Sequence, residues 1–428
     1  MKYAVLILLA AAGLWAQEPA EANYDEAKVG SYTLPDPLTM ANGQPVKDAR
    51  TWTRARRPEL LRIFEQQVFG RNLPPRSKPL VEVVEAGAPA LDGKALRKQA
   101  VIWFSGKKEG PKVNVLVYLP AAARGPAPVF VGLGFGSNAT VHQDPGILAG
   151  ESWMRDPQDK TKFVKQTTPE KARGLSASRW QVEKVIGRGF GLAVANYNDI
   201  EPDFVGGIGY GVRPLGFRAG QTEPAADEWG AIGAWAWGLS RIVDFLLTDK
   251  AVDAKRIALI GHSRLGKTAL WAGAQDERFA LVISNNSGEG GAALARRNYG
   301  ETLKRITTAF PHWFCLNYRQ YADDPNRLPV DAHELIALMA PRPVYVASAE
   351  EDRWADPRGE FLAAVAAGRV YELLGKQGLG TDAMPPVNAP IMKTVGYRIR
   401  TGKHDVTEYD WEQYLKFAEM HFGAAAAK

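Results

Sequence analysis

The chain has little cysteine, with Cys315 as the single thiol in 428 residues. One sulfur excludes an intramolecular disulfide and a thiolate-rich metal site, because both need several cysteines. Runs of like charge are also missing, since 53 Lys and Arg residues are interspersed with 47 Asp and Glu residues. The net charge of +6 therefore forms no basic arm, and we expect no binding to nucleic acid.

Long apolar runs are absent after residues 1–16, so we expect no membrane span. Those residues read M-K-Y-A-V-L-I-L-L-A-A-A-G-L-W-A, with one positive charge at Lys2, then an apolar run and small residues. This pattern is typical of a signal peptide and is too short for a permanent transmembrane helix. We predict cleavage after Ala16 and a secreted or periplasmic protein.

Repeats of 20 to 50 residues and long Gly/Ser or Pro-rich linkers are also lacking. With 46% hydrophobic and 23% charged residues, the chain has the composition of a folded globular protein. We therefore expect one catalytic domain over residues 17–428, and a monomer. The H-E-L-I-A segment at His333 lacks the second histidine of a zinc-binding helix, so we expect no metal there.

Short apolar runs alternate with helical patterns from about residue 100 onward. The predicted strands are residues 113–119, 129–133, 192–196, 256–260, 281–284 and 343–347. Near-continuous apolar runs are typical of a parallel sheet that is covered on both faces, which makes the fold class α/β. Residues 228–248 carry an apolar stripe at helical spacing, and we interpret their tryptophans as core residues.

A serine lies where one predicted strand meets a predicted helix. The strand 256–260 runs into G-H-S-R-L-G-K at residues 261–267, and a helical pattern follows. This is typical of a nucleophile elbow, in which a tight turn exposes the serine hydroxyl, here that of Ser263. The second glycine is Gly266, one place later than in G-x-S-x-G, and Leu265 takes its usual position. The alternative is a serine that caps a helix.

A serine nucleophile needs a base and an acid that orients the base. In an α/β-hydrolase the chain order is serine, acid, histidine. The histidines downstream of Ser263 are His312, His333, His404 and His421. His404 is the best candidate because it lies in a glycine-containing loop before the C-terminal helical pattern, whereas His333 and His421 lie in helical runs.

The acid is expected on a loop after a late strand. Residues 343–347 supply the strand, and Glu350, Glu351, Asp352 and Asp356 follow it. Spacing alone does not choose among these carboxylates, which also fit a solvated turn.

Several segments of the chain together resemble the glucuronoyl esterases of carbohydrate esterase family 15. They are residues 261–267, 284–294 (S-N-N-S-G-E-G-G-A-A-L), 300–301 (G-E), 351–357 (E-D-R-W-A-D-P) and 402–405 (G-K-H-D). The resemblance covers about residues 100–425. It implies an α/β-hydrolase fold with a mostly parallel central sheet and helices on both faces. It also implies a secreted esterase that cleaves the ester between (4-O-methyl-)glucuronic acid of glucuronoxylan and lignin alcohols, without metal or cofactor.

The resemblance assigns roles residue by residue. It makes Ser263 the nucleophile, His404 the base and Arg264 the group that steadies the oxyanion. Lys267, Glu301 and Trp354 match residues that bind the uronate. The ordinary alternatives are a solvated helix lysine at Lys267 and a surface or packing role for Glu301 and Trp354.

The chain departs from part of the family at the acid. Asn286 stands where many members have a glutamate, and an amide carries no charge to hold an imidazolium. Other members place the acid in the later loop, at the position of Asp352. We therefore predict Asp352 as the acid, with Glu289 and Asp356 as lesser alternatives. His262 replaces a cysteine before the serine.

Two rival functions stay open on the sequence. One is an acetyl xylan esterase or another secreted carbohydrate esterase on the same fold, which needs the triad but not the uronate-binding residues. The other is an inactive carbohydrate-binding relative. The Gly-rich segment 132–138 follows a predicted strand and is either a second oxyanion donor or a simple turn.

Overall fold

The computed structural model describes residues 22–75 and 77–423. The predicted signal peptide and the alanine-rich end at 424–428 lie outside these ranges. In the part of the chain that is described, every helix is too short or too polar to cross a bilayer.

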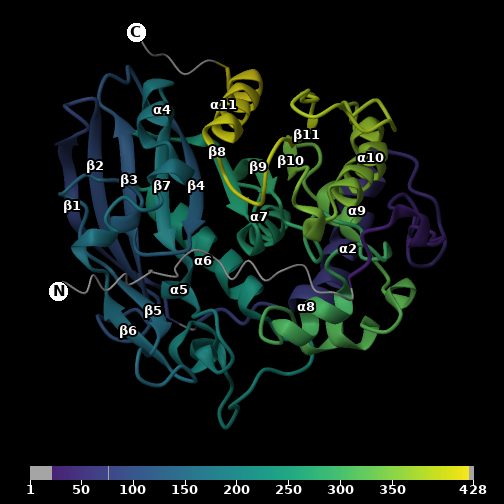
Figure 1. Ribbon diagram of the computed structural model, residues 1–428, viewed down its shortest axis with the longest axis horizontal. Coiled ribbons are helices and arrows are strands. Elements are labelled where there is room, and N and C mark those ends of the chain that lie inside the picture. Colours follow the sequence, from purple (N-terminus) through teal and green to yellow (C-terminus); the bar gives the residue numbers. More distant parts are fainter. Residues whose placement is uncertain (1–21, 76, 424–428) are drawn as a thin grey trace, which may run out of the picture.

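A large mixed sheet forms the centre of the molecule. Its strands, in spatial order, are β1 (Leu80–Ala90), β2 (Ala95–Trp103), β3 (Lys112–Pro120), β7 (Gly191–Asn196), β4 (Ala127–Gly134), β8 (Val252–His262), β9 (Phe279–Asn285), β10 (Val344–Ala349) and β11 (Val395–Arg400). Figure 1 shows them in this order from left to right. The strands from β7 to β11 pair in parallel, whereas β1, β2 and β3 add to the β7 edge antiparallel.

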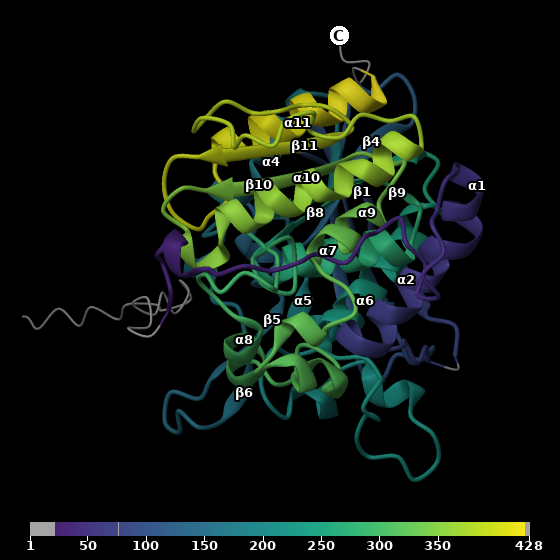
Figure 2. The same ribbon diagram turned by 90° about the vertical axis from the view of Figure 1, so that its right-hand side faces the viewer.

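Helices cover both faces of this sheet. The helices are α1 (Ala49–Thr51), α2 (Arg57–Phe64), α3 (Ala177–Trp180), α4 (Val182–Gly187), α5 (Tyr197–Ile200), α6 (Ala231–Leu246), α7 (Arg264–Gln275), α8 (Leu303–Ala309), α9 (Ala332–Ala337), α10 (Pro357–Leu373) and α11 (Glu408–Phe422). Residues of α2, α6, α7, α9 and α10 form one buried apolar cluster with the sheet. Residues of α4 and α11 form a second cluster against the opposite face. Figure 2 shows α10 beside β10, with α11 on the far side of β11. The predicted α/β-hydrolase fold is confirmed.

The predicted elements between residues 113 and 347 are confirmed with small differences at their ends. Each predicted strand coincides with one of β3, β4, β7, β8, β9 and β10. The helix predicted over 228–248 is α6, and it begins at Ala231 after Gly230. Trp229, just before this helix, and Trp235 within it are fully buried, as expected of core residues.

Three strands of the sheet, β1, β2 and β11, were not predicted from the sequence. The sheet begins at residue 80 instead of about 100. β1 is an edge strand, so much of it is exposed and it shows no buried apolar run. β2 and β11 carry charged residues in the middle of their sequences. Arg97 in β2 and Arg398 in β11 are buried because carboxylates pair with them, namely Glu85 and Asp410. Because each strand buries a charged residue in an ion pair, neither strand shows the continuous apolar run from which the other strands are predicted.

An antiparallel hairpin of β5 (Glu151–Arg155) and β6 (Phe163–Thr167) lies between β4 and β7 in the chain. Aromatic rings attach it to the segment after α5, since Phe163 and Phe204 stack with ring centroids 4.2 Å apart.

Candidate active site

Ser263 occupies a strained turn between β8 and α7. Its backbone angles are φ 59° and ψ −129°, which side-chain-bearing residues rarely adopt. A Cβ at Gly261 would lie 1.9 Å from the carbonyl oxygen of Leu265, so the turn needs glycine there. A Cβ at Gly266 would lie 2.9 Å from the Cβ of Ser287, which explains a glycine at this later position. The serine hydroxyl is thereby held at the carboxyl edge of the sheet.

The alternative reading of Ser263 as a helix cap is wrong. In the described ranges, its side chain accepts no capping hydrogen bond from the first turn of α7. The residue as a whole is half-buried. The backbone N–H of Ser263 donates to the carbonyl of Asn285, which ties the turn to β9.

His404 and Asp352 come from separate loops and meet beside this turn. His404 follows β11 and Asp352 follows β10, and the imidazole Nδ1 lies 2.6 Å from the carboxylate Oδ2. Because an ionised carboxylate only accepts hydrogen bonds, Nδ1–H is the donor and Nε2 is left as the basic nitrogen. The His404 ring lies 4.5 Å, centroid to centroid, from that of His262, the residue before Ser263.

The structure pairs Asp352 with a second donor. The side-chain Nδ2 of Asn286 donates to the same Oδ2 atom at 2.7 Å, and the Asp352 side chain is only 4% exposed. Asn286 therefore contacts the carboxylate that the sequence predicts as the acid. The lesser alternatives have other partners, since Asp356 accepts from Arg297 at 2.8 Å and Glu289 accepts from the Tyr318 hydroxyl at 2.6 Å.

A buried polar network under the His404 loop was missed by sequence reasoning. Asn285 Nδ2 lies 2.8 Å from the Nδ1 of His262 and donates to the carbonyl of Asp405 at 3.0 Å. Its Oδ1 accepts from Arg398 at 3.0 Å and from the Tyr414 hydroxyl at 2.7 Å. Asn285 thus links the end of β8, the histidine loop and α11. The available signal was the pair of arginines in the otherwise apolar β11.

Arg264 lies at the first position of α7 with its guanidinium among aromatic rings. The guanidinium carbon is 4.8 Å from the ring centroid of Trp313 and 5.7 Å from those of Phe135 and Phe310. The side chain as a whole is 29% exposed, and its Nε is buried. Aromatic faces attract a guanidinium and restrict where it can lie.

Lys267, Glu301 and Trp354 lie together behind the turn. The ammonium of Lys267 donates to the carbonyl of Ser287 and lies 3.9 Å from Oε2 of Glu301. The Glu301 N–H donates to the Trp354 carbonyl at 2.9 Å. The solvated-lysine alternative is wrong, because the Lys267 side chain is only 5% exposed. Burial lowers the pKa of Lys267 and raises that of Glu301. The attraction between the two charges opposes both shifts but does not cancel them.

Glu289 gives a pH-dependent prediction for this region. Burial raises its pKa from 4.5 to about 8. Between these values the folded chain holds a proton that the unfolded chain has lost, so this group's contribution to stability declines as pH rises. Glu289→Gln removes that contribution. From about pH 5 to about pH 8, we expect its melting temperature relative to wild type to increase by about a few degrees.

Thermal unfolding of both proteins at several pH values measures this difference. Glu350→Gln, at an exposed position in the loop after β10, is the control. A melting-temperature difference between Glu289→Gln and wild type that stays constant with pH would contradict a proton on Glu289.

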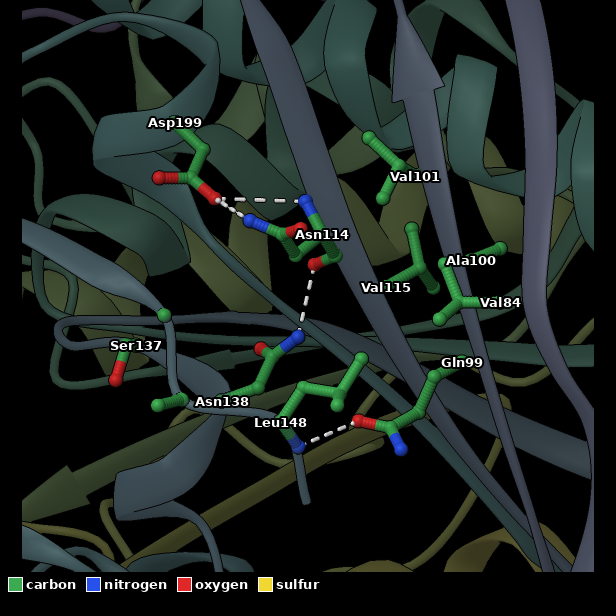
Figure 3. Close-up of a pocket in the computed structure, with 12 residues that line it drawn as sticks. Val84, Gln99, Ala100, Val101, Asn114, Val115, Ser137, Asn138, Leu148 and Asp199 are labelled. Carbon is green, nitrogen blue, oxygen red and sulfur yellow. Dashed lines mark hydrogen bonds between the residues drawn. The ribbon is translucent and has the colours of Figure 1, made fainter. Parts of the chain in front are cut away.

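The Gly-rich segment 132–138 lies next to the turn. The ring of Phe135 is 6.1 Å from that of His262, centroid to centroid. Its role as an oxyanion donor stays a prediction. In Figure 3, Asn138 at the end of this segment donates to the Asn114 carbonyl at 2.9 Å, at the wall of a small cavity lined by polar and apolar side chains.

That cavity measures about 30 Å³, which suits one or two waters, and none of the predicted site residues lines it. Among residues 22–75 and 77–423, no cluster of three His, Cys, Asp or Glu side chains is arranged to hold a metal ion.

Comparisons with known proteins agree in pointing to one family. The family model described as "Glucuronyl esterase, fungi" matches residues 224–375. The chain is 46% identical to "Carbohydrate esterase MZ0003" from an unknown prokaryotic organism, over 99% of this chain and 98% of that protein.

Two solved structures extend the similarity to three dimensions. A glucuronoyl esterase from Solibacter usitatus is 56% identical and superposes with a TM-score of 0.89, covering 93% of this chain and 100% of that one. A structure described as a promiscuous CE15 esterase from a marine bacterial metagenome is 48% identical with a TM-score of 0.85. It covers 94% of this chain and 100% of that one.

Proposed function

Because similarity of this extent covers nearly the whole chain, the protein belongs to carbohydrate esterase family 15, the glucuronoyl esterases, and we propose that it is a serine esterase acting on lignin-carbohydrate esters. Its substrate is the ester between (4-O-methyl-)glucuronic acid of glucuronoxylan and a lignin alcohol. The observation that carries the proposal is the 2.6 Å hydrogen bond between His404 and Asp352 beside the strained turn of Ser263.

The reaction is acyl transfer in two steps. The Ser263 oxygen attacks the uronate carbonyl carbon while Nε2 of His404 takes the hydroxyl proton. The tetrahedral intermediate collapses, the ester C–O bond breaks, and His404 returns the proton to the leaving alcohol. Water then attacks the glucuronoyl-serine ester with His404 as base, which releases glucuronate and restores the serine.

Arg264 supplies positive charge where the carbonyl oxygen becomes negative. Its backbone N–H follows the nucleophile directly, which is the usual place of one oxyanion donor in this fold. Its guanidinium is held beside the turn by three aromatic rings. Donors fixed before the reaction stabilise the developing charge without reorganisation during it.

We assign recognition of the uronate to Lys267, Glu301 and Trp354. A buried ammonium and a buried carboxylate 3.9 Å apart give a donor and an acceptor for neighbouring sugar hydroxyls. Trp354 lies beside these two residues, because its backbone carbonyl accepts a hydrogen bond from the Glu301 N–H. The three side chains add nothing to the chemistry of an acetyl ester, which has no sugar acid to orient.

Lys267→Met tests this recognition because it removes the charge and keeps the length. We expect kcat/KM on a benzyl glucuronate ester to fall about 10- to 100-fold, since hydrogen bonds to charged groups contribute about 1.5–3 kcal/mol. Hydrolysis of a simple phenyl acetate should change much less. Lys304→Met, at an exposed lysine of α8, is the matched control. Equal losses on both esters would remove Lys267 from sugar recognition.

The activity itself is tested by substrate preference. Steady-state hydrolysis of benzyl and methyl glucuronate esters is compared with release of acetate from acetylated xylan. We expect the glucuronate esters to be the better substrates, and a lignin-carbohydrate fraction to be cleaved. A higher kcat/KM on acetylated xylan would favour the acetyl xylan esterase alternative. Failure of a serine-directed phosphonate to label the protein would favour the inactive carbohydrate-binding relative.

We also propose that the protein is exported, on the pattern of residues 1–16 alone. A mature chain that begins at Gln17 in the secreted or periplasmic fraction is the expected product. Residues 17–428 would then act as one catalytic domain and as a monomer.

A further inference from the structure

Asp203 is a buried carboxylate that lies just beyond the proposed catalytic residues. It follows α5, and its side chain is 3% exposed. The carboxylate Oδ1 accepts from Nε2 of His312 at 2.8 Å and from Nε1 of Trp313 at 2.6 Å. Neither Asp203 nor these donors belongs to any motif in the sequence.

The other carboxylate oxygen contacts the proposed oxyanion residue. Oδ2 accepts from the Tyr197 hydroxyl at 2.8 Å and from Nη1 of Arg264. Each oxygen of the carboxylate thus accepts two hydrogen bonds, and an ionised carboxylate has room for about four in total. Although burial raises the pKa of Asp203, the charge of Arg264 and the His312 hydrogen bond outweigh it and hold the pKa well below its usual value.

Arg264 has few other means of holding its orientation. Its Nε is buried and has no hydrogen-bond partner among the described residues. The rings of Phe135, Phe310 and Trp313 restrict the guanidinium to a slot but do not fix its rotation within that slot. The direction of its N–H groups is therefore set by the hydrogen bond to Asp203, together with an interaction with the Tyr197 side chain.

We propose that Asp203 is the positioning residue of the oxyanion site, and that it acts by fixing the Arg264 guanidinium beside Ser263. This inference rests on the proposed function, because it assumes that Arg264 stabilises the tetrahedral intermediate. A carboxylate near an oxyanion carries an electrostatic penalty. The donors from His312 and Trp313 reduce that penalty by stabilising negative charge on Oδ1, the carboxylate oxygen that does not contact Arg264.

The segment that carries Asp203 is itself fixed. The Asp203 N–H donates to Oδ1 of Asn198 at 2.8 Å. Two residues earlier, the buried Glu201 carboxylate accepts from Nε of Arg213 at 2.9 Å, and Arg213 also donates to the Trp229 carbonyl. Glu201 is a buried acid of the same segment whose ion pair is with Arg213. It therefore serves as a matched control for the burial of a carboxylate here.

The test is a double-mutant cycle in the full-length protein with a benzyl glucuronate ester. In Asp203→Asn, the new amide presents N–H groups where one oxygen had accepted two hydrogen bonds. We expect kcat to fall about 100-fold, as for a misplaced catalytic group, with KM changed by less than about threefold. In an Arg264→Met background the same substitution should cause no further loss, because its effect passes through Arg264.

Two further variants separate positioning from folding. Tyr197→Phe deletes one of the four donors without adding a group, and we expect kcat to fall about fivefold. Glu201→Gln should lower the melting temperature and leave kcat unchanged. If Asp203→Asn does not fold, the same cycle is run with Tyr197→Phe, whose loss should also disappear beside Arg264→Met.

The outcomes distinguish this inference from the proposed function. Losses that multiply in the double variant, or an unchanged kcat in folded Asp203→Asn, would overturn the positioning role alone. A wild-type protein without activity on glucuronate esters, or a fully active Ser263→Ala, would overturn the proposed function first.

Discussion

Replacing Ser263 with alanine is expected to lower kcat on a benzyl glucuronate ester by about 10⁵-fold or more. Without the hydroxyl, no covalent glucuronoyl intermediate forms, and deletion of the nucleophile of a serine triad removes nearly all of its rate acceleration. Substrate binding should remain, because the lysine and glutamate assigned to the sugar are untouched. Steady-state turnover and the loss of labelling by a phosphonate measure the change.

The backbone at this position gives the substitution a second, smaller effect. Alanine is the least demanding side-chain-bearing residue at a positive φ, so the strain at residue 263 should change little and the variant should fold. Ser31→Ala, at an exposed serine of the N-terminal segment, is the control for loss of a hydroxyl. Wild-type turnover in Ser263→Ala would reject the serine mechanism.

Asp352→Asn is expected to lower kcat by about 10⁴-fold. An amide keeps the shape of the side chain but does not stabilise the imidazolium, and it can select the wrong tautomer of His404. KM should change little, since Asp352 contacts the histidine and Asn286, not the sugar-binding group. The measurement is kcat and KM over a range of pH, because an uncoupled histidine also alters the pH profile of kcat.

Asn286→Asp provides the comparison for the acid. It places a second carboxylate where an amide now donates to Oδ2 of Asp352. Two adjacent carboxylates raise the pKa of one of them, so the pair keeps one negative charge for His404 at neutral pH. We expect this variant to lose less activity than Asp352→Asn. The reverse ranking would assign the acid to another residue.

The sequence predicts the central strands well because their burial is apolar. Strands β3, β4, β7, β8, β9 and β10 lie in the interior of the sheet and carry the continuous apolar runs that such burial requires. β11 reads V-G-Y-R-I-R, and its two arginines are buried with Asp410 of α11, which pairs with both. That pairing joins two elements through tertiary contact, so local sequence carries no sign of it.

The candidate site divides in the same way. Ser263 and His404 were predicted from local signals, a strand followed by a glycine-flanked turn and a loop before a helix. Asp352 was one of several carboxylates in its loop, and the family resemblance was needed to select it. Asp203 left no local signal. Asn285 lies in the family-like segment 284–294, but its contacts could not be predicted from it, because the partners of both residues include side chains more than 60 positions away in the chain.

The contact between Asn285 and Tyr414 bears on how the protein can be truncated or tagged. Tyr414 and Asp410 belong to the last helix, and through Asn285 and the β11 arginines they brace the segment that presents His404. We expect that truncation of the chain into α11, or fusion of a bulky tag that displaces this helix, would displace His404, the proposed general base, while most of the sheet stays folded. An affinity tag on the amino-terminal side of the described residues would leave α11 intact.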